Sequence, residues 1–225
     1  MFPSFENKGN IADSNSVFDW NPNNGIVSGF GANRMIRLWN VETENQLQTL
    51  PTNSERGLSC LNHDPKILIF YLVDLIMEKL LVYDIRVKPA MSLVQCLTEH
   101  KNQIINFKKQ FDSEEVLISG SVQGDVKFWD LRKPYALKTL TPYQGLMTAL
   151  EIHDYCPLIA CGSNNHSVKI FNTNGDLLNI IGYYDSFIVQ KLGMVHAVSF
   201  HPYQIYLAAT ADSLISVFIP SYLKN

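Results

Sequence analysis

The residues best suited to metal chemistry lie close together in the second half of the 225-residue chain. His153, Cys156, Cys161 and His166 follow the spacing His-x2-Cys-x4-Cys-x4-His. All four are zinc ligands, and the intervals match those of a zinc knuckle. The alternative is structural, because Leu158–Gly162 has the composition of a β-strand, which would direct Cys161 into a sheet interior. We favour the structural interpretation and expect no metal and no cofactor.

A Ser-His-Asp hydrolase is the second chemistry that the residue types allow. The strained turn that presents the serine of many hydrolases needs the spacing G-x-S-x-G. The segment 120–124 reads GSVQG, which places the serine one position too early. We therefore expect no catalytic residue and no enzyme, although a hydrolase stays open as an alternative class.

One loop favours protein binding. Ile181–Gly193, IGYYDSFIVQKLG, is longer than a typical connection of about 4–6 residues and is rich in aromatic side chains. It either folds back with its aromatic residues packed or exposes them to a partner, since aromatic side chains dominate protein interfaces. The candidate protein-binding residues are Tyr183, Tyr184, Asp185 and Phe187.

Composition narrows the class of protein. The chain is 46% hydrophobic and 17% charged, which is enough apolar material for a folded core. Its net charge of −3 offers no excess of basic residues, so we expect no nucleic-acid partner. The longest apolar run, Ile67–Val73, is far shorter than the roughly 20 residues of a membrane helix, so we expect no direct membrane insertion. Four cysteines do not make a disulfide scaffold.

The elements that position these residues recur along the chain. Five short strands, IRLWN, LLVYD, VKFWD, VKIFN and ISVFI, each carry an aromatic residue, and the aromatic residues are 44, 46, 42 and 47 positions apart. This period and the aromatic-Asp or aromatic-Asn pair are typical of WD repeats, in which four antiparallel strands form one blade of a β-propeller. The aromatic residues, which we expect to be structural, are Trp39, Tyr83, Trp129, Phe171 and Phe218.

The predicted fold class is all-β, a WD-repeat β-propeller with about five blades. A disordered segment is expected over 1–10 and a tail over 220–225. The fifth repeat stops soon after its third strand, so we expect an incomplete ring, as in a fragment of a longer protein. The expected blades are 11–50, 57–98, 99–140, 145–181 and 195–219.

The second repeat is irregular. It reads FYLVDLIMEKLL where the other repeats have a glycine-containing turn, and Asp74–Leu81 is compatible with a short helix. We favour a degenerate pair of strands, and a local error in the gene sequence stays open as the alternative.

WD repeats also suggest a structural role for the Ser, His and Asp residues. In such blades a histidine, a serine, an aspartate and the tryptophan of the third strand form a hydrogen-bonded set. His100, Ser119 and Trp129 occupy three of these places, and Gln123 stands where the aspartate would be. We expect a weakened structural set here.

The run Gly145–Pro202 resembles the C-terminal WD-repeat propeller of the Raptor family, the regulatory-associated proteins of TOR. The segment YYDSF followed by QKLG is its most specific part, with LIACGS and NTNGDLLNII in support. Upstream, VFDWNPNNG, MIRLWNVETE, GLSCLNHDP and SVQGDVKFWDLR extend the resemblance to about residues 15–219. FYLVDLIMEKLL departs from the family pattern, as do Cys156 and His166.

The resemblance implies a non-enzymatic scaffold of TOR complex one that docks proteins for TOR kinase signalling in nutrient-regulated growth. The implied partners are the TOR kinase, other components of that complex, and kinase substrates or regulators. The implied location is the cytoplasm, with recruitment to the lysosomal surface through partners. The alternative is a generic WD-repeat adaptor, such as a ubiquitin-ligase substrate receptor.

Overall fold

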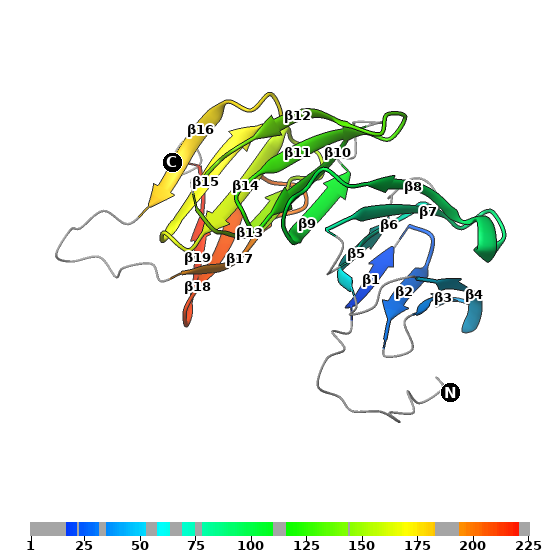
Figure 1. Cartoon of the computed structure of the whole chain (residues 1–225). Coiled ribbons are helices and arrows are strands. Elements are labelled where there is room, and N and C mark those ends of the chain that lie inside the picture. The colour runs from blue at the N-terminus through cyan, green and yellow to red at the C-terminus, as the bar shows by residue number, and fades with distance from the viewer. Residues whose placement is uncertain are drawn as a thin grey trace, which may run out of the picture. The chain divides into compact units, whose positions relative to one another are not determined.

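The computed structural model describes residues 17–21, 23–31, 35–52, 58–63, 69–74, 78–109, 116–143, 145–182 and 194–220. Its chain divides into two compact units, Met1–Ile104 and Ile105–Asn225. Within the described residues, every regular element is a β-strand except one short 3-10 turn, Pro89–Met91. The strands form antiparallel sheets in which each strand pairs with the next along the chain (Figure 1). This arrangement confirms the all-β prediction.

The described residues of the first unit form two four-stranded sheets. One sheet consists of β1 (Val17–Asn21), β2 (Ile26–Phe30), β3 (Met35–Asn40) and β4 (Asn45–Pro51). The other consists of β5 (Leu58–His63), β6 (Ile69–Asp74), β7 (Leu80–Asp84) and β8 (Leu93–Leu97).

Within this unit β1 packs against β5. The Asp19 carboxylate of β1 accepts a hydrogen bond from the backbone N–H of His63 at 3.0 Å and also contacts its Nδ1. The apolar core beneath them combines residues of both sheets, including Leu38, Leu50, Leu58 and Tyr83.

The irregular second repeat forms strands. β6 pairs with β7 over five positions, from Ile69 with Asp84 to Val73 with Leu80. The short helix that Asp74–Leu81 allows is therefore not what forms, because both of its ends belong to strands. The connection between β6 and β7, residues 75–77, lies outside the described residues.

In the second unit, the part of the chain that the structure describes forms three sheets. The first is β9 (Ile104–Lys109), β10 (Val116–Ser121), β11 (Val126–Asp130) and β12 (Ala136–Leu140), with β9 beginning at the unit boundary. The second is β13 (Met147–Ile152), β14 (Leu158–Ser163), β15 (Ser167–Asn172) and β16 (Leu177–Gly182). The third has three strands among the described residues: β17 (Val195–Phe200), β18 (Leu207–Ala211) and β19 (Leu214–Phe218).

The third strands carry the repeated aromatic residues, and most of these side chains are buried. Trp129 is fully buried, Tyr83 and Phe171 are nearly so, and Trp39 and Phe218 are half-buried. The Trp129 indole Nε1–H donates to Ser119 Oγ at 2.7 Å. Both groups are buried, so this hydrogen bond ties β11 to β10 inside the sheet.

The other two residues of the expected hydrogen-bonded set, His100 and Gln123, differ from each other in burial. His100 is buried in the first unit, whereas Gln123 is exposed in the turn between β10 and β11. In that turn Ser121 donates its hydroxyl to the Asp125 carboxylate.

Close approach of neighbouring sheets depends on glycine in β14. An added Cβ at Gly162 would lie 2.6 Å from Val195 Cγ1 and 3.3 Å from Ala149 Cβ. Neither neighbour has a flexible end that can move aside, since valine is branched at Cβ and alanine has no further atoms. Sheets β13–β16 and β17–β19 therefore pack at a distance that only glycine allows at this position.

We predict that Gly162→Ala lowers the free energy of unfolding by about 1–3 kcal/mol, because the added methyl group overpacks this contact. The measurement is urea denaturation of the full chain. Gly31→Ala is the matched control, since no atom of the described residues lies within 4 Å of its added Cβ, and it should change stability by less than about 0.5 kcal/mol. Equal effects of the two substitutions would show that the sheet contact is not tight.

A second prediction concerns the Trp129–Ser119 hydrogen bond. Ser119→Ala should cost about 1–3 kcal/mol, because the buried indole N–H loses its acceptor. Adding Ser119→Ala to Trp129→Phe should cost much less, because the donor is already gone. Thermal or urea denaturation of the two single variants and the double variant measures this coupling, and strictly additive losses would contradict it.

Candidate protein-interaction surface

The residues that the sequence predicts to bind proteins belong to the loop between β16 and β17. Tyr183, Tyr184, Asp185 and Phe187 lie within 183–193, outside the described residues. The described residues on either side of it are Gly182 at the end of β16 and Met194 before β17. The loop therefore connects two sheets of the second unit.

Apolar side chains are exposed on two strands of the second unit, β16 and β19. They are Leu177, Leu178 and Ile180 of β16 and Leu214, Ile215 and Val217 of β19. A pocket of about 240 Å³ lies between the two strands, lined by Asn179, Ile181, Val217, Phe218 and Ile219. None of these five side chains titrates, so the described lining of the pocket suits apolar groups better than charged ones.

The turn between β13 and β14 is built around a buried histidine. His153 Nδ1 accepts hydrogen bonds from the backbone N–H groups of Tyr155 and Cys156, both at 3.1 Å. This places the ring proton on Nε2, which lies 3.2 Å from the backbone carbonyl oxygen of Gln204. His153 therefore fixes its own turn and joins it to the turn between β17 and β18.

The turn between β17 and β18 repeats this construction. His201 Nδ1 accepts from the backbone N–H groups of Tyr203 at 3.2 Å and Gln204 at 3.1 Å. The tyrosines of the two turns stack, with ring centroids of Tyr155 and Tyr203 5.7 Å apart and an interplanar angle of 23°. Tyr203 is 76% exposed and Tyr155 43% exposed. An aromatic pair thus bridges two sheets at the surface, and we call it the tyrosine pair.

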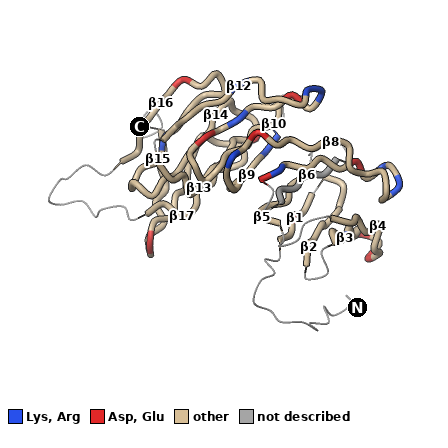
Figure 2. The backbone as a smooth tube through the Cα atoms, in the orientation of Figure 1, with Lys and Arg blue, Asp and Glu red and all other residues tan. Residues whose placement is uncertain are grey.

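The residue before Tyr155, Asp154, belongs to a cluster of three charged side chains. Lys108 Nζ lies 3.1 Å from Glu151 Oε1 and 2.7 Å from Asp154 Oδ1. Burial lowers the pKa of Lys108, but the two carboxylates outweigh it and raise that pKa above its usual value. Burial raises the pKa of Glu151, against the attraction of Lys108. Elsewhere on the described backbone, Lys and Arg are interspersed with Asp and Glu (Figure 2).

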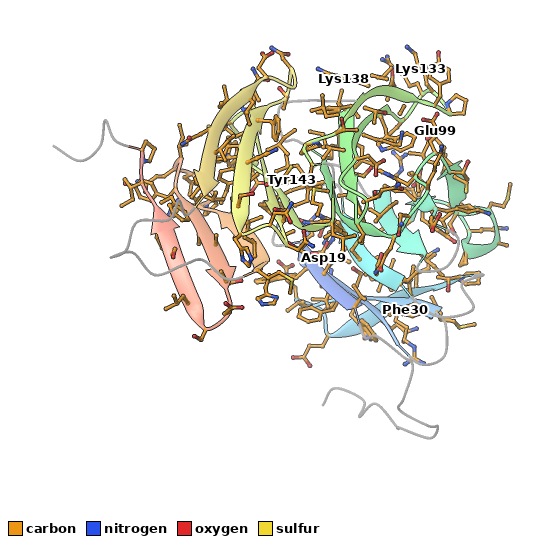
Figure 3. All side chains as sticks on the ribbon, turned by 60° about the vertical axis from the view of Figure 1, so that its left-hand side comes forward. Asp19, Phe30, Glu99, Lys133, Lys138 and Tyr143 are labelled. Atoms are coloured by element: carbon orange, nitrogen blue, oxygen red, sulfur yellow. The ribbon has the colours of Figure 1, made fainter. Side chains whose placement is uncertain are left out.

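The four residues with zinc-knuckle spacing do not converge. Both ring nitrogens of His153 face backbone groups, and Cys161 is buried in β14. Burial raises the pKa of the Cys161 thiol to about 12, which disfavours the thiolate that zinc requires. Tyr143, labelled in Figure 3 beside β15, donates its hydroxyl to the Cys161 carbonyl oxygen at 2.8 Å. The described residues contain no group of three or more His, Cys, Asp and Glu side chains arranged to hold a metal.

The tyrosine pair was not among the binding residues predicted from the sequence. The signal was present, because both tyrosines stand two positions after a histidine, as His153-Asp154-Tyr155 and His201-Pro202-Tyr203. Each histidine in turn ends or follows the first strand of a repeat.

Curated proteins similar to this chain are Raptor proteins. The protein raptor homolog of Dictyostelium discoideum is 33% identical over 96% of this chain. The regulatory-associated protein of TOR 1 of Arabidopsis thaliana is 33% identical over 92%. The target of rapamycin complex 1 subunit mip1 of Schizosaccharomyces pombe is 30% identical over 93%.

Solved structures agree on the fold. Raptor of Chaetomium thermophilum superposes with a TM-score of 0.81 at 26% identity, over 90% of this chain and 19% of that one. A chain of the mitotic checkpoint complex gives a TM-score of 0.71 over 91% of this chain and 60% of its own. At 18% identity the second likeness shows the fold alone.

The match covers this chain but only a part of its relatives. The chain spans about 15–16% of the length of the three curated proteins. No protein-family profile matches it. The resemblance stated from YYDSF, QKLG and the neighbouring motifs is nevertheless confirmed across nearly the whole chain. These 225 residues are a WD-repeat β-propeller region homologous to part of the Raptor proteins.

Proposed function

We propose that this chain is a docking scaffold of a TOR complex, in which it holds other proteins and performs no chemistry itself. The observation that carries the proposal is the match of more than nine-tenths of the chain to Raptor proteins, one of which is named as a subunit of target of rapamycin complex 1. The partners we propose are the TOR kinase, other subunits of its complex, and kinase substrates or regulators. Such a scaffold would work in the cytoplasm and reach the lysosomal surface through its partners.

The described surface supports binding over catalysis. Its exposed features include apolar strands and a pocket whose described lining is uncharged, and such groups bury area against a partner. The buried thiol of Cys161 is held protonated, and the buried Ser119 hydroxyl accepts from Trp129. Among the described residues no helix is long and apolar enough to cross a membrane.

Within the proposal, Tyr183, Tyr184, Asp185 and Phe187 are contact residues. Their support is the length and the aromatic content of the segment, which follows β16 and precedes β17 in the sequence. Aromatic side chains at the centre of an interface carry much of its binding free energy.

We predict that replacing the three aromatic residues, Tyr183, Tyr184 and Phe187, by serine lowers retention of the TOR kinase by roughly tenfold or more. Loss of a few interface anchors costs at least about 1.4 kcal/mol, which corresponds to that factor. The measurement is capture of the tagged chain from extracts of its source organism, with the bound kinase quantified by mass spectrometry.

The matched control is Tyr135→Ser, which removes an aromatic residue that is 54% exposed in a turn of the same unit and should leave retention unchanged. Thermal unfolding of each variant checks the fold, and an unfolded triple variant would show that the loop is packed core. If the unaltered chain retains ubiquitin-ligase subunits and no TOR kinase, the proposed function is wrong and the generic adaptor holds.

A further inference from the structure

The tyrosine pair is an exposed aromatic surface that the proposed function does not use. Tyr203 is among the most exposed large side chains of the second unit, and further apolar residues are exposed in the two turns of the pair. Ile205 is 40% exposed, and Pro157 and Pro202 are exposed in the same two turns. Tyrosine with exposed apolar neighbours is the composition found at the centre of protein interfaces.

This surface is held rigid before any partner arrives. Each turn has two backbone N–H groups directed at a histidine Nδ1, and His153 Nε2 ties one turn to the other through the Gln204 carbonyl oxygen. His201 also makes edge contacts with the rings of Tyr203 and Tyr206, at centroid distances of 6.5 and 5.9 Å. A rigid aromatic surface loses little conformational entropy on binding, which favours a specific ligand over a diffuse one.

The negative charge of Asp154, next to Tyr155 in the sequence, favours a cationic ligand for the tyrosine pair. Asp154 directly precedes Tyr155, and its carboxylate shares Lys108 with Glu151. Two carboxylates face one ammonium, so the cluster carries a net charge of −1 when all three groups are ionised. The Asp154 side chain is 38% exposed, so a cation from solution can approach it.

We propose that the tyrosine pair and Asp154 bind an arginine of a partner protein, in a segment where apolar residues flank that arginine. The planar guanidinium stacks on the exposed face of a tyrosine ring, which is attractive for a cation. The Asp154 carboxylate supplies the opposite charge, and Ile205 and the two prolines receive the flanking apolar side chains. This surface does not depend on the proposed TOR-complex function, because it is defined by the turns and their charge alone.

The test uses the full chain labelled with fluorotyrosine and observed by fluorine NMR. The resonances of Tyr155 and Tyr203 are assigned from the Tyr155→Phe and Tyr203→Phe variants. The probe is the capped pentapeptide Gly-Leu-Arg-Leu-Gly. We expect both resonances to shift saturably, with half-saturation in about the millimolar range, as befits a single small contact. The resonance of Tyr135 should not move.

Two matched comparisons test separately what the arginine guanidinium and the Asp154 carboxylate contribute to binding. The same peptide with citrulline in place of arginine keeps the shape but lacks the charge, and it should shift the two resonances little. Asp154→Asn keeps an oxygen for Lys108 and should weaken binding of the arginine peptide by about two- to fivefold, the range expected of an exposed ion pair. Added salt should reduce that difference.

The proposal is overturned if the citrulline peptide binds as well as the arginine peptide, or if Asp154→Asn leaves the affinity unchanged. It is also overturned if Tyr155 and Tyr203 shift with protein concentration instead of peptide, since the surface would then bind a second copy of the chain. Each of these outcomes leaves the TOR-complex proposal standing, because capture of the kinase is measured separately.

Discussion

A four-stranded antiparallel sheet has two faces, and in this protein both faces carry apolar residues. One sheet cannot cover both, so each depends on a neighbour for burial. In the second unit, the core that joins the sheet β9–β12 to β13–β16 contains Phe128, Leu150 and Phe171, whereas the core between β13–β16 and β17–β19 is made of smaller residues such as Ala149 and Val195. The same central sheet therefore packs large side chains on one face and small ones on the other. Gly162 lies on the small-residue side, which explains why its missing side chain matters there.

Much of this architecture could be predicted from the sequence because it is local and periodic. The aromatic third strands recur at nearly constant spacing, and each is followed by a turn, so pairing between sequential strands is the simplest arrangement. The second repeat was harder, since Asp74–Leu81 has no glycine turn and satisfies a helical pattern as well. The segment forms strands because β6 pairs with β5 and β7 pairs with β8. This pairing involves residues outside the segment itself. Local secondary-structure propensity alone could not distinguish a short helix from a pair of strands here.

The surface was less predictable for a related reason. A run of aromatic residues such as Tyr183, Tyr184 and Phe187 is visible in a sequence, whereas the tyrosine pair joins residues 48 positions apart. Only the packing of two sheets brings Tyr155 and Tyr203 together.

The four residues with zinc-knuckle spacing show the opposite case, in which residues close in sequence do not converge. Cys161 is buried in its strand. The two nitrogens of His153 face backbone groups of two different turns. Spacing in sequence is thus a poor guide to convergence in a sheet protein.

The tyrosine pair also shows how stability and binding are connected in such a fold. Its two turns belong to different sheets, and they are joined by the stacked rings and by the contact between His153 and the Gln204 carbonyl oxygen. A ligand that touches both rings contacts both sheets, and it binds only when the sheets are packed together. Binding must therefore stabilise the packing, by about 0.4 kcal/mol for a ligand present at a concentration equal to its Kd and by more at higher concentration. Conversely, a substitution that loosens the packing between the two sheets, as at Gly162, would lower the affinity for the ligand without contacting it. The two rings would then no longer be held at a fixed distance.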